Sequence, residues 1–245
     1  MPRLIALILS LCVAASASGK TIEEDVQYYI GLLGELNPRT QATEFEALSG
    51  MGLSDPRLFD AVEKRLLADC EDVRNIREDR ARVAWYFRAL GFSGLDKYKD
   101  TLSRFTEDKI YRNYALSALR DMPQYAKWNP VISDRSKFDP KLNDDVNRIL
   151  NMLRSDDQFL QRVGAKRAFM THEKDQAVVD LLAAQLRASY KTANDSDSVE
   201  TAGWLINALD RGTEGRHALI REISVDKTVH YKLTERAKAL LDRRR

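Results

Sequence analysis

The chain has 245 residues, of which 31% are charged and 44% are hydrophobic, with 39 Lys and Arg against 37 Asp and Glu. Two cysteines are too few for a disulfide-rich scaffold, and a formal net charge of +2 provides no strong electrostatic attraction to nucleic acid. Eleven glycines and six prolines are far below collagen-like or low-complexity levels, so we expect a folded protein of one domain or two small ones.

Residues 1–17 have the pattern of a secretory signal peptide. Arg3 supplies a positive charge, an apolar stretch follows, and Ala15-Ser16-Ala17 offers a small-residue cleavage site. The apolar stretch is shorter than the ~20 residues that cross a bilayer. We therefore predict cleavage near Ala17, a periplasmic or secreted location, and no stable membrane span afterwards. An uncleaved N-terminal anchor is the alternative.

The two cysteines carry separate expectations. Lipidation of Cys12 would require a small residue before it, and bulky Leu11 stands there, so we do not expect a lipoprotein. Cleavage would leave Cys70 as one thiol near the end of an apolar helix, where we expect burial; a bridge between chains is the alternative. The acidic neighbours Asp69 and Glu71 disfavour a thiolate, which argues against a nucleophilic role.

Helical periodicity recurs throughout the rest of the chain, and no segment shows sustained alternation of apolar and polar residues. We therefore predict an all-α protein. Capping patterns indicate where helices begin: Thr21 with Glu24, then Ser54-Asp55-Pro56. Pro38 should end the first helix. Two later pairs predict further starts: Ser155 with Gln158 and Asp197 with Glu200.

An Ala-Leu or Ala-Phe pair recurs at predicted helix ends, at intervals of roughly 30 to 50 residues. After most pairs, a short turn leads to a second amphipathic helix. Small residues inside several first helices would allow close helix packing. The pairs are Ala47-Leu48, Ala89-Leu90, Ala118-Leu119, Ala168-Phe169, Ala208-Leu209 and Ala239-Leu240.

This pattern resembles HEAT and armadillo-type repeats over roughly residues 40–245. The resemblance implies a right-handed α-solenoid of stacked helix pairs, here with irregular repeat lengths; an irregular helical bundle is the alternative. The charged segment 129–145 contains Pro130 and Pro140. We predict a bend there, between an N-terminal repeat block at 18–134 and a C-terminal block at 135–245.

We expect no catalytic, cofactor-binding or metal-binding residues, and therefore no enzyme. His172, His217 and His230 lack a second histidine at i+4 and a cysteine pair to complete a metal site. Deoxyhypusine hydroxylases, which are HEAT-like enzymes, hold iron through several His-Glu pairs, whereas this chain has one, His172-Glu173. Phosphate-loop, dinucleotide-binding and serine-hydrolase motifs are absent from the sequence.

Half of the aromatic residues lie between positions 85 and 128. On a helical wheel Phe87 and Leu90 share one face and Trp85 lies nearly opposite. Core packing is the first explanation, and an interface surface that includes Arg88 is the alternative. Arg82 and Arg112 also lie near this cluster in the sequence and would belong to the same interface.

These observations predict an exported HEAT-like protein that binds or scaffolds a protein partner through a concave face. The sequence indicates neither the partner nor the binding residues. Two alternatives remain open. One is a small-molecule-binding protein or an enzyme, with its site in a cleft between the two repeat blocks. The other is a structural component that assembles through its C-terminal helix.

Overall fold

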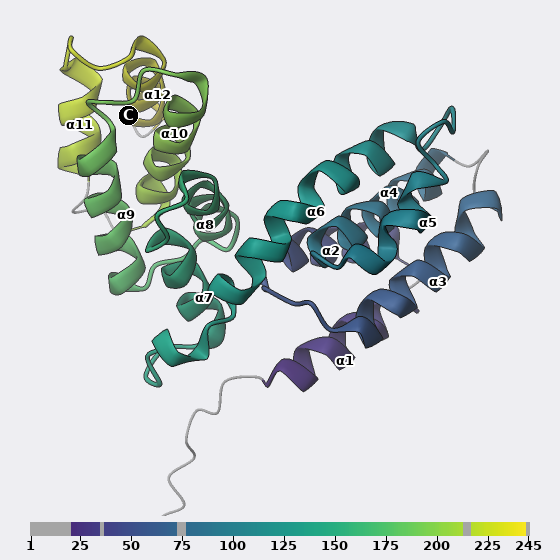
Figure 1. Ribbon diagram of the computed structural model, residues 1–245. Coiled ribbons are helices and arrows are strands. Elements are labelled where there is room, and N and C mark those ends of the chain that lie inside the picture. Colours follow the sequence, from purple (N-terminus) through teal and green to yellow (C-terminus); the bar gives the residue numbers. More distant parts are fainter. Residues whose placement is uncertain (1–20, 35–36, 73–76, 213–216, 244–245) are drawn as a thin grey trace, which may run out of the picture.

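The computed structural model describes residues 21–34, 37–72, 77–212 and 217–243. The predicted signal peptide, its cleavage site and Cys12 lie outside these residues. All regular secondary structure in the described part is helical, so the all-α prediction is confirmed (Figure 1). The α-helices are α1 (Ile22–Leu32), α2 (Pro38–Ala47), α3 (Pro56–Asp72), α4 (Arg77–Phe92), α5 (Lys99–Ser103), α6 (Arg112–Ile132), α7 (Asp144–Leu153), α8 (Gln158–Met170), α9 (Gln176–Ser189), α10 (Ser196–Arg211), α11 (His217–Val225) and α12 (Tyr231–Asp242).

Local caps explain several helix starts. The predicted capping box is present at α1, where the Glu24 amide donates to Thr21 Oγ1 at 3.1 Å and the Thr21 amide donates to the Glu24 carboxylate at 2.6 Å. Pro56 opens α3, as predicted. Two predicted starts are wrong by a few residues, because nearby aspartates cap instead: Asp157 caps α8 and Asp195 caps α10.

Helices two apart in the sequence pack against each other in both halves of the chain. In the first half α1 contacts α3, α2 contacts α4, and α4 contacts α6. In the second half α7 contacts α9, α8 contacts α10, and α10 contacts α12. Figure 1 shows α1–α6 on one side and α7–α12 on the other, with the C-terminal end of α6 reaching α7.

Two hydrophobic cores correspond to these halves, and α6 contributes to both. Met122 belongs to the N-terminal core, whereas Ile132, at the end of the same helix, belongs to the C-terminal core. Phe87 is fully buried in the first core and stacks on Tyr111 at a centroid distance of 5.5 Å. The core explanation is thus confirmed for these two members of the aromatic cluster. Cys70 is buried too, as predicted.

The course of α6 corrects two predictions. The pair Ala118-Leu119 does not end a helix but lies in the middle of α6, and Pro130 lies in the last turn of α6 and not in a loop. Proline disfavours a helical residue before it, but here that residue, Asn129, is buried and its two side-chain N–H groups are shared among four acceptors. Its Nδ2 donates to Leu53 O, Ser54 Oγ, Phe92 O and Ser93 O at 2.8–3.1 Å.

The bend between the halves therefore begins after Ile132 and ends where α7 starts at Asp144. It contains a short 3-10 helix, η3 (Arg135–Lys137). Another 3-10 helix, η1 (Leu48–Gly50), follows α2 and contacts α8 across the junction. No helix among the described residues is both long enough and apolar enough to cross a membrane.

Candidate functional site

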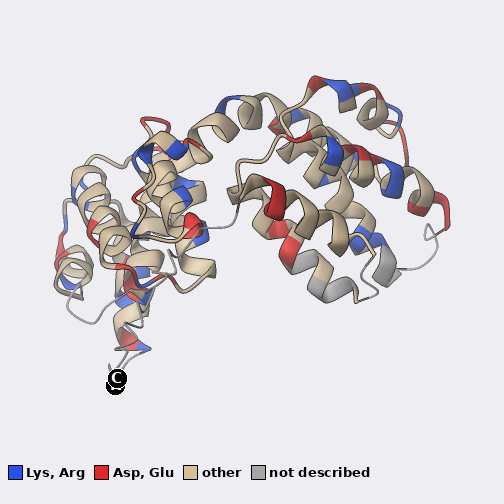
Figure 2. Cartoon of the chain, turned by 90° about the horizontal axis from the view of Figure 1, so that it is seen from below, with Lys and Arg blue, Asp and Glu red and all other residues tan. Residues whose placement is uncertain are grey.

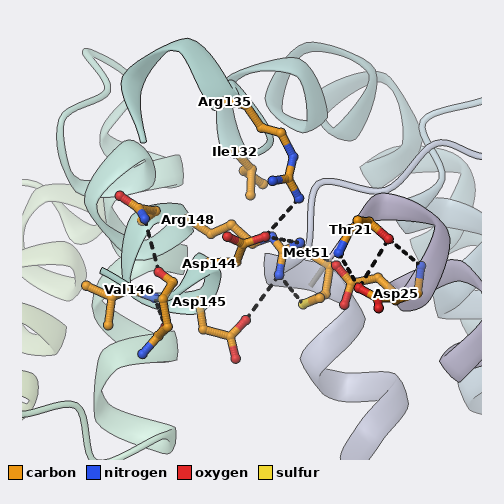
Figure 3. A network of polar contacts seen from close by, with 12 residues as sticks. Thr21, Asp25, Met51, Ile132, Arg135, Asp144, Asp145, Val146 and Arg148 are labelled. Atoms are coloured by element: carbon orange, nitrogen blue, oxygen red, sulfur yellow. Dashed lines mark hydrogen bonds and ion pairs between the residues drawn. The ribbon is translucent and has the colours of Figure 1, made fainter. Parts of the chain in front are cut away.

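A buried ion pair joins the two halves of the molecule. Arg148 of α7 donates from Nη2 to the Asp25 carboxylate of α1, and both side chains are 4% exposed. Nη1 of the same arginine lies 3.2 Å from Asp145 Oδ1 and 3.7 Å from the sulfur of Met51 (Figure 3). We call the pair Asp25–Arg148 the clasp. Its members are 123 residues apart in the sequence.

Further ion pairs support the clasp from α7 and α8. Arg135 donates to Asp144 at 2.8 Å, and Arg167 lies 3.5 Å from the second oxygen of Asp145. These contacts bring α1, α7 and α8 together around the charged groups. Because both charges of the clasp are buried, separating α1 from α7 would leave each of them without its counterion.

A groove lies between the halves beside the clasp. Its first part has a volume of about 480 Å³ and is lined by both halves. Acidic groups outnumber basic ones there, so we call it the acidic end. It is lined by Asp25, Tyr28, Tyr29, Glu44, Ala47, Met51, Asn143, Asp144, Asp145, Arg148, Arg167, Thr171 and Glu173.

The second part of the groove has a volume of about 590 Å³ and shares Glu44, Ala47, Arg167 and Thr171 with the first. The two parts are therefore continuous. Most of its large side chains are aromatic, aliphatic or cationic, so we call it the aromatic end. Its other lining residues are Glu46, Ser49, Trp85, Arg88, Phe92, Tyr125, Val163, Lys166 and Met170.

Two cations at the aromatic end lie against aromatic rings. The guanidinium carbon of Arg88 is 4.4 Å from the centroid of Trp85, and no described residue places a carboxylate within ion-pair distance of it. The Nζ of Lys166 is 5.1 Å from the Trp204 ring and 3.9 Å from the exposed carboxylate of Glu200. Lys166 is thus paired with a carboxylate, whereas among the described residues Arg88 has its charge stacked on an aromatic ring without an ion-pair partner.

Burial changes the acidity of several phenols near the groove. It raises the pKa of Tyr29 and Tyr125 far above the ordinary value of 10.0. The pKa of Tyr28 is raised as well, first by burial and then by the neighbouring Glu44 carboxylate. These phenols are therefore neutral and act as hydrogen-bonding or apolar groups in the groove.

The three histidines are not brought into one site. His172 follows α8 in a left-handed conformation at φ 54°, with its Nε2 2.6 Å from Arg211 Nη1. His217 starts α11, and His230 caps α12 through the Lys232 amide. Within the described ranges, no group of three or more His, Cys, Asp or Glu is arranged to hold a metal ion.

The groove combines residues that the sequence singled out with others that it did not. Trp85 and Arg88 come from the aromatic cluster, and Trp85 is half-buried: it packs on the N-terminal core and also faces the groove. Lys166, Arg167 and Met170 of α8 were not recognised as candidates. Their sequence positions do not indicate that α8 lies across the groove from α4, because that arrangement depends on the bend after α6.

Figure 2 shows acidic and basic residues interspersed along both halves of the chain. The charge asymmetry of the groove is therefore local and comes from the few side chains that line it. The chain was also compared with models of known protein families and with curated proteins, and neither comparison found a match.

Proposed function

We propose that this protein is an exported, non-catalytic module with HEAT-like stacked helix pairs that binds a protein partner in the groove between its halves. The proposal rests on the composition of the aromatic end. Trp85, Arg88 and Met170 are accessible there together, and tryptophan, arginine and methionine are enriched in the energetically important parts of protein interfaces.

The packing of helices two apart supports the HEAT-like part of this proposal. In such arrays every second helix contributes to one face, and the lining of the aromatic end by α4, α6 and α8 follows that rule. The clasp supports binding in another way. Because it connects α1 with α7, it restricts relative movement of the halves, and less conformational freedom is then lost when a partner enters the groove.

The test is affinity capture from cells that produce the protein, with the partner set compared between variants. Met170 is 54% exposed in the groove, and Leu116 is 44% exposed on α6 and lines none of the groove. We expect Met170→Asp, alone or with Trp85→Ala, to reduce recovery of specific partners roughly tenfold or more. Leu116→Asp should leave recovery unchanged.

Thermal melting of each variant verifies that the loss of binding is not a loss of folding. If the same proteins are recovered with wild type, Met170→Asp and Leu116→Asp, the groove is not the binding surface. If no protein is recovered reproducibly by the wild type, the binding function itself is wrong.

A second candidate function is the binding of a small molecule at the acidic end. The observation that favours it is the convergence of Tyr28, Glu44, Arg167 and Glu173 on one volume of about 480 Å³, within the range of ligand pockets. A thermal-shift screen of cationic metabolites tests it. A ligand that stabilises the wild type but not Glu44→Gln would favour this function over protein binding.

A further inference from the structure

We infer that the groove recognises a peptide segment in which an acidic side chain stands next to an aromatic or long aliphatic one. This inference rests on the proposed function and adds the chemistry of the partner. It is carried by Arg88, which is stacked on Trp85 in the aromatic end and has no carboxylate at ion-pair distance among the described residues, with apolar side chains beside it.

The same pairing continues beyond the groove along α8 and α10. Phe169 of α8 lies edge to face with Trp204 of α10 at 5.6 Å, and Lys166 is placed over Trp204. Phe169 also lines the next hollow, of about 350 Å³, together with Leu240 and Arg236 of α12. Cations therefore lie beside apolar side chains on α4, α8 and α12.

Arg236 strengthens this inference because one of its guanidinium nitrogens has no acceptor among the described residues. Its Nη1 is buried, and within the part of the chain that the structure describes it has no hydrogen-bond partner. Gly203 permits its position, since a Cβ there would clash with that guanidinium nitrogen. A buried N–H without an acceptor is destabilising, so a turn of the Arg236 side chain towards a partner carboxylate in this hollow would be favourable.

Charge complementarity decides which partner fits. A carboxylate can accept hydrogen bonds from a guanidinium stacked on an aromatic ring, because stacking leaves the N–H edge of the guanidinium free. The neighbouring aromatic and methionine side chains provide the apolar contact for an adjacent residue of the partner. A polyanion such as nucleic acid fits poorly, because Glu44, Glu46 and Glu173 line the continuous groove and would repel it.

The experiment is selection of random dodecapeptides with amidated C-termini against the full chain, followed by fluorescence-anisotropy titration of the selected peptides. We expect enrichment of Asp or Glu directly beside aromatic or aliphatic residues relative to the input. Affinity should fall with increasing salt, because part of it comes from charge pairing.

The decisive variant is Arg88→Glu/Lys166→Glu, which should weaken the selected peptides roughly tenfold or more. Its control is Arg120→Glu/Lys191→Glu. Lys191 is a close match for Lys166, since it also lies 3.9 Å from a carboxylate and over an aromatic ring, Tyr190, at 5.6 Å. Arg120 is exposed and lines none of the hollows described above. The control should bind like wild type, and both variants should melt cooperatively.

The outcomes separate the two levels of the proposal. Selected peptides that lose binding on Met170→Asp but are neutral or basic would overturn the acidic preference and leave the groove as a peptide-binding site. Equal binding by the decisive variant and its control would also overturn the inference. If no peptide depends on Met170 or on the two cations, both the inference and the proposed groove function fail.

Discussion

Arg148 connects the two halves of the molecule through a buried charge. It is 4% exposed and satisfies Asp25, which is equally buried, so neither charge has water to replace a lost partner. Asn129 has a comparable role within the first half, where its side-chain amide connects the end of α6 to the loop before α3 and to the end of α4. Both residues connect segments that are distant in the sequence.

Replacing one member of the clasp should lower the free energy of unfolding more than replacing both members together. We expect Arg148→Met to lower the free energy of unfolding by about 3–5 kcal/mol, since it leaves Asp25 buried without its cation. The double variant Arg148→Met/Asp25→Leu should recover a large part of this loss, because apolar replacements of a buried pair are often tolerated. Urea unfolding of the wild type and of these two variants measures the difference.

The control for this cycle is Arg120→Met, at an exposed ion pair with Asp121 that should contribute less than about 1 kcal/mol. A double variant no more stable than Arg148→Met would contradict the assignment of the cost to an unpaired carboxylate. The clasp could not be predicted from the sequence. Many carboxylates were equally plausible partners for Arg148, and only the packing of α1 near α7 selects Asp25.

Among single helices, the features that the sequence predicted correctly depend on neighbouring residues in the chain. Thr21 with Glu24 marked the start of α1, because a capping box acts within one helical turn. The end of a helix was predicted less well when distant contacts determined it. In α6, Pro130 stays helical because Asn129 is anchored to segments 36 to 76 residues earlier in the chain.

Substitution by alanine should have opposite effects on stability at two glycines near helix ends. Gly94, after α4, has φ +67°, and a Cβ there would lie 2.5 Å from the backbone nitrogen of Ala126. Gly31, in α1, has nothing within 4 Å of the same position. We expect Gly94→Ala to destabilise by roughly 2 kcal/mol or more, and Gly31→Ala to stabilise by about 0.5–1 kcal/mol.

Thermal or urea unfolding of the two single variants, each against wild type, measures the difference. Equal effects of the two substitutions would show that close packing of Gly94 on α6 does not constrain the turn after α4. A stabilising Gly94→Ala would contradict its left-handed conformation directly.

For the whole molecule, the stability should depend on pH in the alkaline range. Burial raises the pKa of Tyr29 and Tyr125 above the ordinary 10.0, so the folded chain keeps both phenols neutral where the unfolded chain ionises them. Their contribution is complete below about pH 10 and is lost as the pH rises above that value towards the folded-state pKa.

We therefore expect the free energy of unfolding to fall as the pH rises above about 10, and the fall to be smaller in Tyr29→Phe/Tyr125→Phe. Urea unfolding across this range is the measurement. The control is Tyr231→Phe, at a residue that is 61% exposed, and it should follow wild type. An identical pH dependence in wild type and the double variant would contradict the proposed cause.

The periodicity of apolar residues predicted the all-α fold class, but it did not predict the groove. Trp85 and Arg88 stood out in the sequence as members of an aromatic cluster, whereas Met170 did not, because its importance depends on its position opposite α4. The bend that creates this opposition was expected to begin at residue 129 and in fact begins after Ile132. Local sequence patterns could not predict its angle, because that depends on contacts between distant segments such as the clasp.

The long sequence separation of the clasp also has a consequence for synthesis. A ribosome that adds roughly 5–20 residues per second needs about 6 to 25 s to extend the chain from Asp25 to Arg148, 123 positions later. During that interval α1 can dock on α3, while its carboxylate has no counterion. The nascent first half is therefore an incomplete folding unit, and its final alignment is delayed until α7 has been made.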